Sequence, residues 1–186
     1  MATIENPIAV RSKHMLIEAL LDLMEEKPFK DISISELTAK ADLSRRTFYR
    51  LFETKEDILL YHIKTLWYEN VSELYNMPTQ SYFQTSYWSL CFWYSHRSLT
   101  LSLYRNQLLS LLQQFVNSVS MELFDHTKGD IPLRGNEEAL SYALSYSTGG
   151  IINILWKWAS EGMNKTPDQI MNLLMLAYEK PPMKND

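Results

Sequence analysis

Residues 33–52 read SISELTAKADLSRRTFYRLF, and they contain two short segments with helical patterns. Ser33 is followed three residues later by a glutamate, a spacing in which each side chain can satisfy a backbone N–H group of the other, so a short helix is expected to begin there. Ser44 is a good N-cap for a second helix, which places Phe48 and Phe52 on one face, four residues apart. The pattern therefore predicts two short helices, each with one buried side.

A tight turn is expected between these two helices. Asp42 and Leu43 lie there, and aspartate is one of the few residue types besides glycine that adopts the left-handed backbone conformation of such turns. The buried side of the first helix consists of Ile34, Leu37 and Ala41. Two short helices joined this closely fit a helix-turn-helix.

The second helix carries a basic face opposite its phenylalanines. That face consists of Arg45, Arg46, Thr47, Tyr49 and Arg50. Arginine can hold guanine O6 and N7 together, a threonine methyl group can touch the thymine methyl, and a tyrosine hydroxyl can reach a phosphate. The helix N-termini at Ser33 and Thr54 offer further N–H donors to phosphate, and Lys55 adds a positive charge.

The basic face has two possible interpretations. Three arginines in six residues are often just a solvated helix face, but this does not explain why they fall on the second helix of a tight pair. The net charge of the whole chain is -4, which argues against binding nucleic acid by bulk attraction. Any contact with DNA must therefore come from this local patch.

Helical periodicity extends on both sides of the motif. Apolar residues recur at three- and four-residue steps from about residue 10 to 26, and Thr54, with an aspartate three residues on, opens a long helix to about Tyr75. Residues 82–94 are unusually aromatic, and residues 99–124 carry leucine at helical spacing. No segment has the pattern of a strand, so the sequence predicts an all-α fold.

Two more helices are expected after a loop at residues 129–136. The first has apolar residues in four-three alternation, as in a helix packed nearly parallel to another: Leu140, Leu144, Ser147, Ile151, Ile154 and Trp158. This seam suits either a homodimeric four-helix interface or a core contact within one chain, and periodicity does not separate the two. Gly162 is placed to end this helix, and Thr166 to cap the last one. The side chains of the last helix that should face inward are those of Ile170, Leu173, Leu174 and Ala177.

Composition narrows the class of protein further. The chain has 186 residues, of which 46% are hydrophobic, so it can bury a core without a disulfide or metal. The single cysteine, Cys91, excludes an internal disulfide framework. Because we find no secretory signal and no long uncharged apolar span, we expect a cytoplasmic protein without a membrane partner.

The sequence contains no recognisable catalytic or metal-binding motif. The four histidines, His14, His62, His96 and His126, are far apart in sequence, and no HExxH, GxSxG or Gly-rich phosphate loop occurs. No two histidine, cysteine or carboxylate positions form a distinctive metal-ligand pair. We therefore expect neither an enzyme nor a metal site, and no cofactor.

Residues 39–59, AKADLSRRTFYRLFETKEDIL, resemble the signature of the TetR/AcrR family of transcriptional regulators. The resemblance implies a three-helix DNA-binding domain at residues 8–53 and a helical C-terminal domain at residues 54–180 that dimerises and usually holds an effector. It also implies that bases are contacted by Ser44, Arg45, Arg46 and Thr47, and phosphates by Ser33, Tyr49 and Lys55. Arg50 belongs to the same DNA-binding face.

The chain departs from the family pattern at two positions where glycine is frequent, Asp42 and Arg46. Aspartate suits the turn for the backbone reason given above. Arg46 adds charge to the face directed at the groove, so we expect it to alter operator preference rather than abolish binding.

The resemblance further implies a repressor that binds a pseudo-palindromic operator as a homodimer and responds to an effector. Aromatic and neighbouring residues could line an apolar effector pocket, although aromatic stripes are more often core. The candidates are Tyr61, His62, Tyr87, Trp88, Cys91, Tyr104 and Trp156. The effector could be a small apolar or aromatic molecule, or a protein. The alternative function is a helical protein-interaction co-regulator whose operator binding is lost or weakened.

Overall fold

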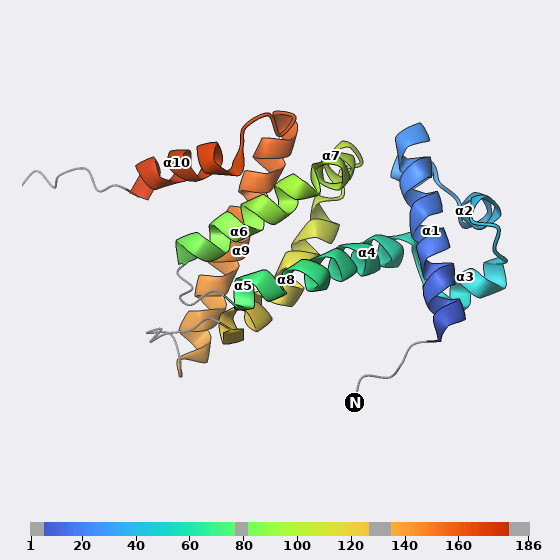
Figure 1. Ribbon diagram of the computed structural model, residues 1–186, viewed down its shortest axis with the longest axis horizontal. Coiled ribbons are helices and arrows are strands. Elements are labelled where there is room, and N and C mark those ends of the chain that lie inside the picture. The colour runs from blue at the N-terminus through green and yellow to red at the C-terminus, as the bar shows by residue number, and fades with distance from the viewer. Residues whose placement is uncertain (1–5, 77–81, 127–134, 179–186) are drawn as a thin grey trace, which may run out of the picture.

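The computed structural model describes residues 6–76, 82–126 and 135–178, and the regular elements in these ranges are all helical (Figure 1). This confirms the all-α prediction. In chain order the elements are α1 Pro7–Glu26, η1 Phe29–Asp31, α2 Ile34–Lys40, α3 Arg45–Leu51, α4 Lys55–Asn70, α5 Ser72–Tyr75, α6 Tyr82–Ser95, α7 Arg97–Arg105, α8 Leu109–His126, α9 Glu137–Ser160 and α10 Pro167–Tyr178.

Side-chain caps set the helix starts in the N-terminal unit, α1 to α3. The Asn6 side chain accepts the Ile8 N–H at 2.9 Å, so α1 begins earlier than the apolar periodicity indicated. The predicted caps are confirmed, because Ser33 Oγ accepts the Glu36 N–H at 3.2 Å and Ser44 Oγ accepts the next helix's third N–H at 3.0 Å. The Glu36 carboxylate does not complete a capping box, since it pairs with Lys27.

The predicted turn and core of this unit are also confirmed. Asp42 has φ 52, the left-handed conformation that the turn between α2 and α3 requires. Leu16, Leu20, Leu37 and Phe48 are fully shielded from solvent, each with 0% of its surface exposed. Because Phe48 comes from the middle of α3, its burial fixes which side of α3 faces outward.

The helix α4 leads from the N-terminal unit into the helical bundle (Figure 1). A complete capping box starts it: Thr54 Oγ1 accepts the Asp57 N–H at 3.2 Å, and the Thr54 N–H donates to the Asp57 carboxylate at 2.8 Å. The expected single helix to Tyr75 is divided at Val71 into α4 and α5.

Aromatic side chains fill the centre of the bundle. Trp67 of α4 packs edge-to-face against Trp88 and Phe92 of α6, with ring centroids 5.1 and 5.2 Å apart, and against Phe115 of α8 at 5.5 Å. These are favourable aromatic geometries. The aromatic run at residues 82–94 therefore serves first as core.

The leucine-rich stretch is helical as expected, and it forms two helices, α7 and α8, separated by a turn. Gln107 has φ 58, and this left-handed residue turns the chain between α7 and α8. The turn is closed by hydrogen bonds from the Gln107 N–H to Tyr104 O and from the Leu108 N–H to Leu103 O, both at 3.0 Å.

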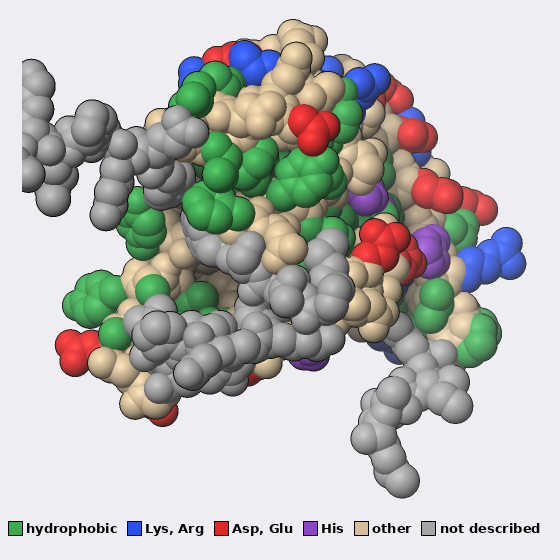
Figure 2. All heavy atoms as spheres, turned by 60° about the vertical axis from the view of Figure 1, so that its left-hand side comes forward, with side chains coloured by type: hydrophobic (Ala, Val, Ile, Leu, Met, Phe, Trp, Pro, Cys, Tyr) green, Lys and Arg blue, Asp and Glu red, His purple; other side chains and the backbone are tan. Residues whose placement is uncertain are grey.

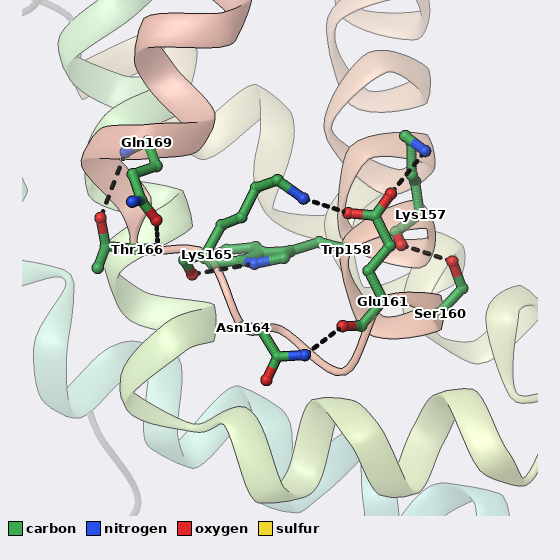
Figure 3. Close-up of polar contacts among 8 residues, drawn as sticks. All are labelled: Lys157, Trp158, Ser160, Glu161, Asn164, Lys165, Thr166 and Gln169. Carbon is green, nitrogen blue, oxygen red and sulfur yellow. Dashed lines mark hydrogen bonds and ion pairs between the residues drawn. The ribbon is translucent and has the colours of Figure 1, made fainter.

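The predicted end of α9 and start of α10 are confirmed. Gly162 has φ 74 just past α9, and Thr166 and Gln169 exchange reciprocal capping hydrogen bonds of 2.9 and 3.3 Å. Figure 3 shows the carboxylate of Glu161 between two lysines, Lys157 at 2.8 Å and Lys165 at 2.7 Å. These ammonium groups lower the pKa of Glu161 to about 2.

The four-three seam of α9 is buried in its own chain only at its two ends, and its middle residues Leu144, Ser147, Ile151 and Ile154 are partly buried. Leu140 is 8% exposed and Trp158 only 1%, with its ring stacked on Tyr94. Of the residues expected to face inward on α10, Ile170 is buried but Leu173 is 54% exposed. The side chain of Ala177 and most of the predicted loop at 129–136 lie outside the described residues.

Candidate nucleic-acid interface

The outward face of α3 presents three arginines whose charges are available. Arg45, Arg46 and Arg50 are exposed, and no ion pair to them is found among the described residues. Two nearby lysines, in contrast, are engaged in ion pairs: Lys27 pairs with Glu36, and Lys40 pairs with Glu26 at 2.7 Å. These two ion pairs neutralise Lys27 and Lys40 and leave the arginines of α3 as unpaired positive charges.

The N-terminus of α3 is held by two hydroxyl groups. Ser44 Oγ accepts the Thr47 N–H at 3.0 Å and lies 2.9 Å from Thr47 Oγ1. Ser44 therefore has a structural role as the N-cap, and Thr47 is half-buried beside it. Their predicted base contacts remain predictions.

Two further predicted contacts lie at the edge of this face. Tyr49 is 54% exposed, and its ring stands edge-on to buried Phe48 at 5.1 Å, which limits its movement. Ser33 is exposed at the start of α2 and caps that helix. Both positions are accessible to a phosphate backbone.

Lys55 points inward, unlike the phosphate contact expected from the sequence. Its Nζ donates to Phe29 O and, at 2.8 Å, to Ile32 O, and it lies 4.5 Å above the Phe29 ring. Burial lowers the pKa of Lys55, while Glu56 and Asp31 act in the opposite direction. The ammonium group joins the start of α4 to η1, an arrangement that does not support its phosphate role.

Three further contacts attach the N-terminal unit to the bundle. The Phe29 N–H donates to Asn106 Oδ1 at 2.7 Å, and Arg105 pairs with Glu25 at 3.1 Å, so the α7–α8 corner contacts the N-terminal unit directly. Lys13 of α1 lies 4.1 Å above the Tyr61 ring of α4. The role of Asn106 is not evident from the sequence, because nothing in the local pattern relates it to a residue 77 positions away.

The candidate effector residues are not brought together in one cavity. Trp88 belongs to the aromatic centre, and Tyr104 packs edge-on against Trp156 at 5.0 Å between α7 and α9. The Tyr87 hydroxyl donates to Asp168 at 2.8 Å, and burial raises the pKa of the neighbouring Cys91 thiol.

The other two candidates, Tyr61 and His62, belong to α4 near the N-terminal unit. Burial lowers the pKa of His62, and His96 and His14 act in the same direction. This separation follows from the helical period, which turns successive aromatic residues toward different neighbours. A role of any of the seven toward an effector remains a prediction.

A groove of about 340 Å³ lies elsewhere in the bundle, between α6, α9 and α10. We call it the α9 groove. Its lining includes Phe83, Ser86, Gly149, Ile154, Met171 and Leu174. Figure 2 shows that the surface is hollowed on the side where apolar side chains gather.

Metal sites and membrane spans are not found in the part of the chain that the structure describes. No grouping of three or more histidine, cysteine or acidic side chains suits a metal ion there. In the same residues, no helix combines the length and the apolar character needed to cross a bilayer.

A tight helix pair with an unpaired basic face, followed by a helical bundle, defines the class of helix-turn-helix DNA-binding transcriptional regulators. The family model described as bacterial regulatory proteins, tetR family, matches residues 16–61. A second model, described as a transcriptional regulator C-terminal region, matches residues 84–179. The chain belongs to the TetR family. No curated relative matches it significantly.

Proposed function

We propose that this regulator is a repressor that binds a pseudo-palindromic operator as a homodimer. The observation that carries the proposal is the set of three exposed, unpaired arginines on α3, held outward by fully buried Phe48. A helix of this kind can enter the major groove, where arginine distinguishes guanine from other bases.

The proposed contacts divide along α3. Arg45, Arg46 and Thr47 in its first turn read base edges, with Ser44 at the start of the helix. Arg50, Tyr49 and Ser33 hold phosphates on either side, which fixes the register of the protein on the duplex. Lys55 is left out because its ammonium group is bonded to backbone carbonyls.

Exposed apolar side chains on α9 and α10 support the homodimer. Tyr142 and Tyr146 of α9 are each 74% exposed, and Leu173 and Leu176 of α10 are 54% and 64% exposed. A two-fold axis places the same patch of both chains in contact and buries these side chains. It also sets the two recognition helices ~34–36 Å apart, one turn of B-DNA.

We further propose that an effector bound in the C-terminal domain changes operator affinity. It does so by favouring a dimer geometry in which the two copies of α3 no longer match the groove spacing. Such coupling typically amounts to ~1–3 kcal/mol.

Selection of bound sequences from random DNA tests the operator proposal. We expect a palindromic consensus, and we expect Arg45→Ala to lose about 1–3 kcal/mol at one base position. Arg97→Ala is the matched control, because it removes the same charge from an exposed position on α7. Absence of any enriched sequence would contradict operator binding and favour the protein-interaction co-regulator.

A further inference from the structure

We propose that Lys55 is a positioning residue for operator binding: it holds η1 against the start of α4 and so orients the helix-turn-helix without touching DNA. The inference rests on the proposed operator binding. It gives a function to a lysine that the sequence suggested as a phosphate contact and that the structure turns inward.

The first argument is the place of η1 in the chain. Only Ile32 and the N-cap residue Ser33 separate η1 from α2, the first helix of the helix-turn-helix. Phe29 and Ile32 are buried, so both ends of this short segment are anchored in the core. Because α2 and α3 share that core through Leu37 and Phe48, a displacement of η1 also displaces α3.

The second argument is the geometry of the Lys55 ammonium group, which holds η1 from the side of α4. Its Nζ donates to Phe29 O at the start of η1 and, at 2.8 Å, to Ile32 O just after η1. The same group lies 4.5 Å above the Phe29 ring. Two hydrogen bonds and a ring contact thus fix a side chain that is otherwise long and flexible.

The third argument is that Asn106 holds the same segment from the side of the bundle. Its Oδ1 accepts the Phe29 N–H at 2.7 Å, and its Nδ2 donates to Ser102 O at 2.9 Å, which fixes the orientation of the amide. The backbone of Phe29 is therefore held through its carbonyl by α4 and through its N–H by the α7–α8 corner. We call Lys55, Phe29 and Asn106 the η1 clamp.

The charges around Lys55 do not favour a phosphate ligand. The carboxylates of Glu56 and Asp31 lie within electrostatic range of the ammonium group, and burial lowers the pKa of Lys55. Turning the side chain out to DNA would also remove its hydrogen bonds to the two carbonyl groups. The ammonium group is therefore retained by its backbone acceptors.

The orientation of the N-terminal unit matters because the proposed operator is read twice. In the homodimer, two copies of α3 must enter successive major grooves ~34–36 Å apart. A rotation about η1 leaves each copy of α3 able to bind a single half-site, but it changes the separation of the pair. Loss of the η1 clamp should therefore weaken binding to the full palindrome and spare binding to one half-site.

Lys55→Met tests this role, because it keeps an apolar stem and removes the ammonium donors. We expect affinity for the full palindrome to fall about tenfold. Affinity for an isolated half-site, and the slope of its logarithm against the logarithm of salt concentration, should stay unchanged. Lys64→Met is the matched control and should bind both DNAs as the wild type does, because it removes the same charge from an exposed position on the same helix.

A phosphate contact by Lys55 would give a different result and would overturn the proposal. Lys55→Met would then weaken half-site binding too, and the salt slope at the half-site would decrease by about 0.9. A purely stabilising role would also overturn it, because a folded Lys55→Met protein would then bind both DNAs as the wild type does. Thermal melting establishes the folded fraction of each variant.

Asn106→Leu keeps the proposal testable if Lys55→Met does not fold, because it should show the same loss at the palindrome alone. Where both variants fold, the double variant completes a cycle. Since both residues hold Phe29, we expect the double variant to lose less affinity than the product of the two single losses. Fully independent losses would contradict a shared clamp.

Hydrogen exchange at the Phe29 amide examines the η1 clamp without DNA. Lys55→Met should speed this exchange about threefold or more, because the segment that carries the amide is released. Unchanged exchange would overturn the clamp. If the wild type selects no DNA sequence while Lys55→Met speeds the exchange, the operator proposal alone is rejected.

Discussion

Individual side chains determine where positive charge is available on this acidic protein. Lys40 pairs with Glu26, which raises the pKa of the lysine, and the carboxylate of Glu36 has its pKa lowered by Lys27. Lys40 and Glu26 are exposed and Lys27 and Glu36 are partly exposed, so the pairs contribute little stability. Their consequence is electrostatic, because the arginines of α3 are left as the charges that an approaching phosphate meets.

Arg46 is exposed on the outward face of α3 and is one of the two positions where the family resemblance led us to expect glycine. We expect Arg46→Gly to change which operator sequences are selected, because a bidentate base contact can contribute about 1–3 kcal/mol of discrimination. Selection from random DNA with both proteins measures this. An identical selection profile for the two proteins would exclude a specificity role.

Glu161 is predicted to make stability depend on acid pH. Its pKa of about 2 in the folded chain lies below the ordinary value of 4.5. The carboxylate therefore stabilises the fold above pH 4.5, and this contribution is lost as the pH falls toward 2. Urea unfolding should show Glu161→Gln less stable than wild type at pH 7, with the difference shrinking below pH 4.5. A difference that does not change with pH would refute this assignment.

At the scale of elements, the helix starts could be predicted from local sequence signals, whereas long-range contacts could not. The caps at Ser33, Ser44 and Thr54 depend on residues within one turn, so sequence was sufficient to place α2, α3 and α4. Gln107 adopts a conformation that glutamine does not favour, so only tertiary packing specifies the turn there. The inward direction of Lys55 also depends on tertiary packing, because its two acceptors are Phe29 O of η1 and Ile32 O just after it, and the helical pattern did not predict η1.

The α7–α8 corner is predicted to fix the orientation of the DNA-binding unit. Asn106→Leu removes the acceptor of the Phe29 N–H, and a buried donor left unpaired costs about 1–3 kcal/mol. We expect faster hydrogen exchange at the Phe29 amide and selection of operators with a wider range of half-site spacings. Asn106→Asp keeps an acceptor oxygen and is the matched control. Equal exchange rates in all three proteins would show that the corner does not constrain the unit.

At the scale of the whole molecule, the proposed DNA-binding and self-association surfaces lie far apart. Figure 1 places α3 at one end of the molecule and α10 at the other, with α4 and the bundle between them. Of the seam residues of α9 that suggested a dimer, Leu140 and Trp158 are buried inside the chain, whereas Tyr142 and Tyr146 beside the seam are exposed. Association through the exposed face therefore leaves α3 free to contact DNA.

Leu176→Lys tests this arrangement, because it adds a charge to the proposed interface at a side chain that is 64% exposed in the single chain. We expect dissociation to monomers, measured by sedimentation, and at least a tenfold loss of affinity for the full palindrome, about 1.4 kcal/mol. Affinity for an isolated half-site should stay unchanged, since α3 is intact. Met121→Lys is the control on α8, where the methionine is 48% exposed. A dimer that persists in Leu176→Lys with full operator affinity would place the interface elsewhere, and equal dissociation of both variants would show that any added charge disrupts the protein.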